Sequence, residues 1–226
     1  AFFLGLSLGQ VFYGSLTDRY GRRPMLLIGL LIYVLSSAGC ALASSVDALI
    51  VFRFLQAAGS CSAMVITMAV VRDRYGPAEG AHMISRMMLI MGVAPILAPL
   101  LGGFILTTVG WQAIFWFQAL YGAVLVTSIA LLLPETRPAH TRAPTGVWSA
   151  LKTYGGVLSH RRFLGYALSR GLAQGGMFAY IAGSPFVFIT LHGVPPQYFG
   201  LLFGLNAIGI IGASQVNVRL LRRYSP

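Results

Sequence analysis

The stretch from Gly14 to Leu27, GSLTDRYGRRPMLL, decides the fold. It places one acid and three arginines in a short turn between two apolar segments that carry no charge. Gly21 permits a sharp reversal of the chain, and Pro24 can open the helix that follows. A loop that only set membrane orientation would explain the arginines but not Asp18. We therefore expect Asp18 to pair with Arg22 or with a helix N-terminus.

The composition of the whole chain indicates a membrane protein. Of its 226 residues, 57% are hydrophobic and 9% are charged, and the mean hydropathy is +0.77. Soluble chains carry about 25% charged residues. A soluble enzyme, a disordered chain and a disulfide-stapled secreted domain are thereby excluded, and long continuous apolar runs exclude a transmembrane barrel. The expected fold class is an all-α polytopic membrane protein.

Seven apolar segments are long enough to cross a bilayer: residues 1–17, 25–44, 48–71, 87–107, 111–133, 163–191 and 199–218. Fourteen of the sixteen Lys and Arg residues lie in alternate connections, including 72–86, or after the last segment; Arg53 and Arg170 lie within segments. The positive-inside rule makes these basic connections cytoplasmic, with residue 1 outside and residue 226 inside. The net charge of +11 then reports orientation, and no nucleic-acid partner is expected.

Residues 134–162 form the one long linker. Its first half, PETRPAHTRAPTG, is expected to be irregular. Its second half predicts a short interfacial helix anchored by Trp148. The predicted organisation is an N-terminal helical half over 1–133, this linker, and the start of a second helical half over 163–226. Because the chain opens without Met in mid-hydrophobic sequence, we expect it to be the middle of a longer protein.

The turn resembles the signature loop G-x-L-x-D-R-x-G-R-R of the major facilitator superfamily, in its drug:proton antiporter branch. The resemblance implies a major facilitator fold of twelve helices, of which the chain holds about seven, helices two to eight. It also implies a conformational gate between the second and third helices. The implied gate residues are Gly14, Asp18, Arg19, Gly21 and Arg22, with Asp73 as the carboxylate at the end of the fourth helix.

Arg53 and Gln56 resemble the family motif R-x-x-Q-G of helix four, although Ala57 replaces its first glycine. An arginine in hydrocarbon costs roughly 2.5 to 3.5 kcal/mol, so it normally faces a cavity or a partner. The alternative is snorkelling to the outer interface, since Arg53 lies only about 8 Å along the helix from Ala48. We favour a role for Arg53 and Gln56 in proton coupling at a central cavity.

The segment GVAPILAPLLGGF resembles the antiporter motif of helix five, and its two prolines should kink the helix. Its AP-x-x-AP-x-x-GG form, with FAYIAGSPFVFI and HGVPPQYFGLLFGLNA further on, is similar to the Bcr/CflA subfamily of bicyclomycin and chloramphenicol exporters. The motif residues are Pro95, Pro99, Gly102 and Gly103. Candidates for lining a substrate cavity are Gln174, Tyr180, Ser184 and Asn206.

Several further expectations concern single residues. Arg170 is expected to snorkel to the cytoplasmic interface. An aromatic belt at the outer interface is suggested by Trp111, Trp116, Phe115 and Phe117. Cys40 and Cys61 lie in apolar runs and are expected to be unpaired packing residues.

The resemblance implies a proton-coupled efflux transporter of the bacterial inner membrane that exports small amphipathic drugs or metabolites by alternating access, as a monomer. No cofactor is expected, because the proton gradient is the energy source. None of the five acids lies deep in a predicted span, so the proton-carrying acid is expected on helix one, before this chain begins. No nucleophile motif or metal-ligand spacing is found, so no enzyme activity is expected.

Two alternatives stay open on the sequence. Seven spans, an outside N-terminus and the triplet Asp73-Arg74-Tyr75 also fit a seven-span receptor. Against it, a similar triplet, Asp18-Arg19-Tyr20, follows the first span, and the turn after it has no receptor role. The other alternative is a truncated paralogue that does not transport.

Overall fold

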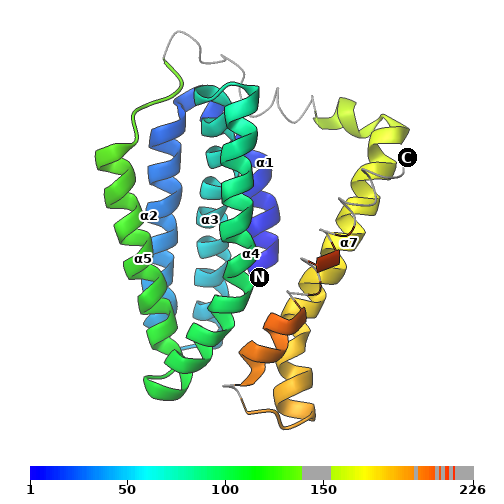
Figure 1. The fold of residues 1–226 in the computed structure, drawn as a ribbon. Helices are drawn as coiled ribbons and strands as arrows, with labels where there is room; N and C mark the ends of the chain where they lie inside the picture. Colours follow the sequence, from blue (N-terminus) through cyan, green and yellow to red (C-terminus); the bar gives the residue numbers. More distant parts are fainter. Residues whose placement is uncertain (139–153, 196–197, 207–208, 210–211, 214–215, 217–226) are drawn as a thin grey trace. The chain divides into compact units, whose positions relative to one another are not determined.

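The computed structural model describes residues 1–138, 154–195, 198–206, 209, 212–213 and 216, without the side chains of residues 95 and 96. Most of this chain is helical, which confirms the all-α prediction (Figure 1). The helices are α1 (Phe2–Tyr20), α2 (Arg22–Ala41), α3 (Val46–Arg74), α4 (Pro77–Thr108), α5 (Trp111–Leu132) and α7 (Arg161–Pro185), followed by the π-helical turn Phe186–Leu191. Residues 154–158 and 198–206 are also helical.

Five helices of the described chain are long and apolar enough to cross a membrane: α2, α3, α4, α5 and the segment Arg161–Leu191. The predicted spans at 1–17 and 199–218 are not among them. The first of these nevertheless forms α1, a helix of 19 residues. Much of the second falls outside the described residues.

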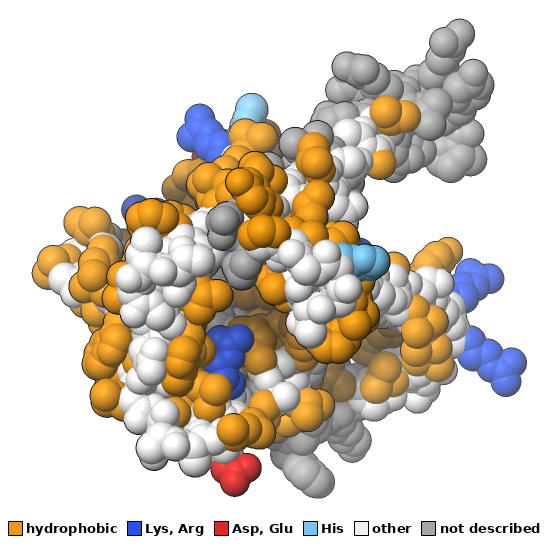
Figure 2. Space-filling view, turned by 90° about the horizontal axis from the view of Figure 1, so that it is seen from below, with side chains coloured by type: hydrophobic (Ala, Val, Ile, Leu, Met, Phe, Trp, Pro, Cys, Tyr) orange, Lys and Arg blue, Asp and Glu red, His pale blue; other side chains and the backbone are white. Residues whose placement is uncertain are grey.

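The surface of the described chain exposes many large apolar side chains, and several polar side chains are buried among the apolar ones of the interior. Leu35, Leu131 and Leu132 are between 69% and 80% exposed, whereas Thr17 and Gln56 are each 1% exposed. Hydrophobic side chains are spread widely over the surface in view in Figure 2. Lipid favours this distribution, because apolar side chains face it without cost while polar groups pair between helices.

The chain divides into two compact units. The first holds Ala1–Ile84 and Trp111–Ala167, and the second holds Ser85–Gly110 and Leu168–Pro226. In the first unit α3 packs against both α1 and α2, and α2 packs against α5. The division of the chain at a 134–162 linker stays a prediction.

Small residues bring α3 close to its neighbours. A Cβ added at Gly5 would collide with the carbonyl oxygen of Phe54, and one added at Gly9 would lie 2.7 Å from the Sγ of Cys61. The Gly5 and Gly9 pair therefore serves tight packing of α1 on α3. Cys61 is buried at this contact, and both Cys61 and Cys40 are unpaired, as expected.

Gly59 makes the corresponding contact between α3 and α2. An added Cβ would lie 2.6 Å from the carbonyl oxygen of Gly29 and 2.6 Å from the amide nitrogen of Tyr33. Both atoms are backbone, so the helices themselves must separate to admit a methyl group. We expect Gly59→Ala to destabilise the protein by about 1–3 kcal/mol, as overpacking does.

Thermal unfolding of the purified full-length protein in detergent checks this expectation. Gly80→Ala is the matched control, because a Cβ there meets only Val71, at an ordinary 3.9 Å. Equal unfolding temperatures for the two variants would show that the α2–α3 contact tolerates a larger residue.

Two helix boundaries correct the sequence predictions. The predicted basic loop at 72–86 is wrong, because α3 continues to Arg74 and α4 begins at Pro77. Hydropathy locates the apolar part of a helix, whereas Pro77 at the first helical position and Glu79 in the first turn start α4 earlier. The span predicted at 163–191 is not uniform either: α7 ends at Pro185 and a π-helical turn follows, since proline cannot donate the next helical hydrogen bond.

The predicted interfacial helix lies partly outside the described residues, as do Trp148 and the rest of 139–153. Residues 154–158 are helical, in agreement with its second half. The Tyr154 hydroxyl lies 3.4 Å from the carbonyl oxygen of Val11 and donates to it, so this end of the linker contacts α1.

Candidate functional site

The turn between α1 and α2 is a single residue, Gly21. Its φ of 102° lies in the left-handed region that favours glycine. The Gly21 N–H donates to the carbonyl oxygen of Thr17 at 3.1 Å, which ends α1. Arg22 then begins α2, with Pro24 in its first turn. The expected reversal at Gly21 is confirmed, and it sets Asp18 beside Arg22.

Arg22 lies between two carboxylates. Its Nη1 is 2.8 Å from Oδ1 of Asp18, and its Nε is 2.8 Å from Oδ2 of Asp73 at the end of α3. The Arg22 side chain is 7% exposed, against 42% for Asp18 and 26% for Asp73. The expected pairing of Asp18 with Arg22 is confirmed, and Arg22 joins the ends of α1, α2 and α3.

Two linker residues complete this arrangement. The Arg137 Nη1 lies 2.7 Å from Oδ1 of Asp18. The Glu135 carboxylate accepts hydrogen bonds from the backbone N–H of Arg22 at 2.9 Å and of Arg23 at 3.3 Å. We call Asp18, Arg22, Asp73, Glu135 and Arg137 the gate cluster. The sequence motifs did not identify Glu135 or Arg137 as site residues. A signal for Glu135 was nevertheless present, because it is an acid in an otherwise basic linker. Asp18 was identified by the same kind of signal.

Two of the residues implied by the signature loop lie outside the gate cluster. Arg19 is exposed, with its guanidinium 5.3 Å from the ring centroid of Tyr20. A Cβ at Gly14 would meet only the Tyr154 hydroxyl, at an ordinary 3.6 Å. The structure therefore brings together Asp18, Arg22 and Asp73 but not Gly14 and Arg19.

Arg53 points into the first unit. Its Nη1 donates to Oε1 of Gln56 at 2.7 Å. Its guanidinium carbon lies 4.5 Å from the ring centroid of Phe2 and 5.5 Å from that of Phe115. Such cation–π contacts stabilise a partly desolvated cation by roughly 0.5 to 2 kcal/mol. Phe115 thus contacts Arg53 from α5, and its place in an aromatic belt stays a prediction.

A polar network continues from Gln56 across three helices. The Gln56 Nε2 donates to the Ser37 hydroxyl at 2.6 Å and to Oε1 of Gln118 at 2.9 Å. Ser37 and Gln118 were not among the predicted site residues, although a Gln within the uncharged span 111–133 was a signal for Gln118. Among the described residues, no Asp or Glu forms an ion pair with Arg53; the three ion pairs found there all involve Asp18 or Asp73.

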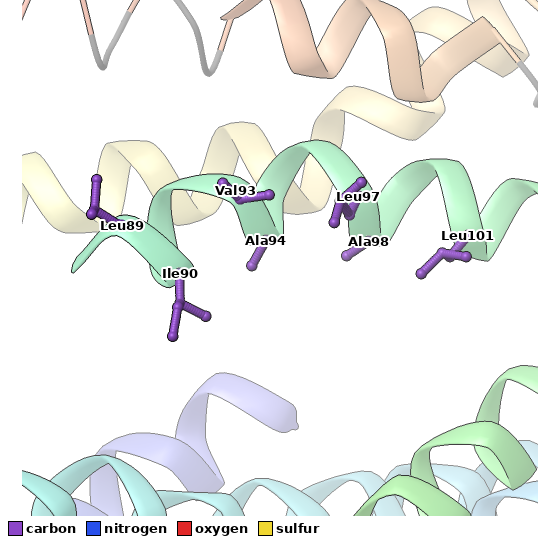
Figure 3. A pocket seen from close by; sticks show the side chains of 7 residues that line it. All are labelled: Leu89, Ile90, Val93, Ala94, Leu97, Ala98 and Leu101. Atoms are coloured by element: carbon purple, nitrogen blue, oxygen red, sulfur yellow. The ribbon is translucent and has the colours of Figure 1, made fainter. Parts of the chain in front are cut away.

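The segment that resembles an antiporter motif lies on α4 in the second unit. The helix runs without interruption through Pro95, Pro99, Gly102 and Gly103. The Pro95 side chain lies outside the described part, and a Cβ at Gly102 would meet nothing within 4 Å. The preceding turns present an exposed apolar groove (Figure 3), lined by Leu89, Ile90, Val93, Ala94, Leu97, Ala98 and Leu101.

The four candidate cavity residues are placed differently from one another. Tyr180 stacks on Phe203, with ring centroids 5.6 Å apart and planes at 18°. Ser184, one turn later on α7, is buried, and its hydroxyl has no hydrogen-bond partner within the described structure. Gln174 is half-buried and Asn206 is exposed. Tyr180 thus makes an aromatic contact within the second unit, and Ser184 is the one buried residue of the four.

Comparison with known proteins decides the family. The model of the Major Facilitator Superfamily matches residues 1–226. The chain belongs to this superfamily. Such proteins are multi-pass membrane transporters, in agreement with the apolar exterior of the helices.

Its relatives include transporters with names that refer to drugs. The chain is 41% identical, over 93% of its length, to the uncharacterized MFS-type transporter YdgK of Bacillus subtilis, and covers 53% of that protein. It is 28% identical over 99% of its length to a bicyclomycin resistance protein homolog of Haemophilus influenzae, covering 56% of it. It is 34% identical over 97% of its length to a chloramphenicol resistance protein of Pseudomonas aeruginosa, covering 51% of it. The chain thus spans about half the length of these relatives.

A solved structure supports the fold. The crystal structure of the human organic anion transporter MFSD10 aligns with a TM-score of 0.68 at 24% identity, over 92% of this chain and 52% of that one. At this identity the likeness establishes the fold alone.

Proposed function

We propose that the full-length protein is a proton-coupled efflux transporter for small amphipathic drugs, in the inner membrane of a bacterium, with its basic connections in the cytoplasm. The relatives named for bicyclomycin and chloramphenicol resistance support drug export. The subfamily-like motif on α4 supports assignment to the Bcr/CflA group and to antiport. Membership of a transporter superfamily argues against the alternative of a seven-span receptor.

The observation that supports the proposal most strongly is the environment of the Arg53 side chain. It is a cation within a membrane-spanning helix, held by Gln56 and two aromatic rings, without a carboxylate partner in the described chain. An uncompensated cation at this depth is costly, so such residues mark transport pathways and proton relays. We infer that a carboxylate on a helix outside this chain pairs with Arg53 and carries the transported proton.

This pairing supplies a coupling step. A deprotonated carboxylate is held by Arg53, whereas protonation removes its charge and weakens the attraction. The Arg53 guanidinium would then turn to other groups of the cavity, with Gln56, Ser37 and Gln118 as alternative hydrogen-bond partners. Proton binding and substrate binding can therefore exclude one another at one cavity.

The gate cluster is proposed to control the conformation of the transporter rather than proton binding. It links the ends of α1, α2 and α3 at one end of the first unit. In alternating access, two halves rock about a central site, and contacts at such an end stabilise one conformation over the other. We assign Asp18, Arg22 and Asp73 to this gate, with Gly21 as the turn that positions them.

Substrate contacts are proposed in the second unit. Tyr180 offers an aromatic face, and Ser184 offers a buried hydroxyl with no other described partner; Gln174 and Asn206 stay as further candidates. An aromatic face combined with a few polar groups suits several amphipathic molecules rather than one. We propose a monomer that needs no cofactor and catalyses no reaction.

The proposal is tested by drug accumulation in efflux-deficient bacteria that express the full-length protein. Chloramphenicol, bicyclomycin and a sulfonamide are supplied in turn, with and without a protonophore. We expect at least one of them to accumulate less in expressing cells, and the difference to vanish with the protonophore. Equal accumulation of all three, with the protein present in the membrane, would contradict drug export and favour the non-transporting paralogue.

A further inference from the structure

We propose that the start of the linker, Glu135 to Arg137, is a latch that positions the gate arginine, Arg22. Glu135 acts on Arg22 through the backbone of α2, and Arg137 acts on it through Asp18. The inference rests on the proposed gate and extends it to a segment that no motif assigns to it.

Glu135 serves as the missing N-terminal cap of α2. The residue at the cap position, Gly21, has no side chain to accept the first N–H groups. The Glu135 carboxylate accepts two of them, from Arg22 at 2.9 Å and from Arg23 at 3.3 Å. A carboxylate at this position also interacts favourably with the helix dipole. The backbone that carries the Arg22 side chain is therefore held from the linker, more than a hundred residues away.

Arg137 contacts the end of α1, on the other side of the Gly21 turn from Arg22. Its backbone N–H donates to Oε1 of Glu135 at 2.9 Å, which folds the linker back on itself. Its Nη1 then meets Oδ1 of Asp18 at 2.7 Å. Arg22 uses this same oxygen, at 2.8 Å. Two guanidinium groups therefore share one carboxylate oxygen, so the position of Arg137 affects how strongly Asp18 holds Arg22.

The end of α5 strengthens the connection. The Arg23 guanidinium donates to the carbonyl oxygen of Ala130, in the last turn of α5. Glu135 follows α5 by only a few residues, so the two contacts tie the end of α5 to the start of α2. The latch thus couples the predicted linker to the charge cluster at the proposed gate.

Hydrogen exchange of backbone amides tests the latch without any substrate. The purified full-length protein is compared with Glu135→Ala and with the isosteric Glu135→Gln. We expect exchange at the amides of Arg22 and Arg23 to accelerate by about fivefold in Glu135→Ala, the size of effect that a lost N-cap produces. Glu135→Gln keeps an acceptor but loses the charge and should show a smaller acceleration.

The matched control is Glu79→Gln, which removes an exposed acid in the first turn of another helix, α4. Its exchange at Arg22 and Arg23 should equal that of the unaltered protein. If both Glu135 variants also leave the exchange of Arg22 and Arg23 unchanged, Glu135 does not position α2 and the proposal is wrong. Because the readout needs no transport, its failure is distinct from failure of the drug-export proposal.

Comparing the single variants with the double variant shows whether Glu135 and Arg137 act together or independently. Arg137→Gln should also accelerate exchange at Arg22, by about twofold to fivefold, the range of an ion pair that is partly exposed. If Glu135 and Arg137 act as one unit, Glu135→Ala with Arg137→Gln should accelerate it no more than Glu135→Ala alone. If the double variant instead shows the product of the two single accelerations, the two residues act independently and the latch proposal is wrong.

Discussion

Arg53→Ala in the full-length protein is expected to abolish proton-coupled export while the protein stays folded in the membrane. The substitution removes the cation that we assign as partner of the proton-carrying acid. Truncating one member of a buried charge pair costs about 3–5 kcal/mol, so substrate-driven proton movement should fall by more than about tenfold. The initial rate of substrate-dependent proton release in vesicles measures this.

Two variants decide between coupling and snorkelling. Arg53→Lys keeps the charge and should retain part of the coupling, although it loses the planar stacking between Phe2 and Phe115. Arg86→Ala removes an exposed arginine of α4 and should behave as the unaltered protein. Normal coupling in Arg53→Ala would return Arg53 to the role of an arginine that merely snorkels to the interface.

Arg22→Ala is expected to slow conformational exchange and to leave substrate affinity largely intact. Arg22 is the buried partner of both Asp18 and Asp73, so its loss leaves Asp73 without its described ion pair and leaves Asp18 paired with Arg137 alone. We expect the transport rate to fall about tenfold or more, with the dissociation constant of the substrate changed by less than about twofold. Asp18→Asn should have a smaller effect, because the Asp18 side chain is 42% exposed and water screens its ion pairs.

The control for this prediction is Arg74→Ala, an exposed arginine beside Asp73 in the last turn of α3. It removes the same charge from the same end of the bundle without touching a described ion pair. Transport rate and substrate binding, measured separately at matched protein level, distinguish the variants. Full transport by Arg22→Ala would show that the cluster is a structural salt bridge without a gating role.

Local physical rules were sufficient at the α1–α2 turn. Only glycine adopts the φ of Gly21 at low cost, and an acid among arginines needs a partner, so the turn and the Asp18–Arg22 pair could be predicted from a few residues. The apolar spans could likewise be located by hydropathy, which identified α2 to α5 as membrane helices.

Contacts between distant segments could not be predicted in the same way. Glu135 lies in a linker that is rich in Pro and Thr, and nothing local shows that it meets the N-terminus of α2. Phe115 follows Trp111 by one helical turn, so it shares the sequence features of an interfacial aromatic while it packs against Arg53. The polar N-terminal turns of α4 and the π-helical turn after α7 were missed because hydropathy does not measure helicity.

The Arg53 network and the gate cluster have different roles in the proposed transporter. Arg53 and its polar network lie within the helices and would respond to protons and substrate. The gate cluster lies at the helix ends and would respond to the movement of the halves. In the first unit α3 contributes to both, with Arg53 near its start and Asp73 near its end. The single helix α3 thereby connects the two sites.

The most direct test of this account is proton release from inverted membrane vesicles that contain the full-length protein. A proton gradient is established, and bicyclomycin, chloramphenicol, a sulfonamide and cysteine are added in turn. The account predicts substrate-dependent proton release with at least one compound and none with the Arg53→Ala variant. No release with any compound from vesicles that hold the folded protein, or equal release from the Arg53→Ala variant, would contradict it.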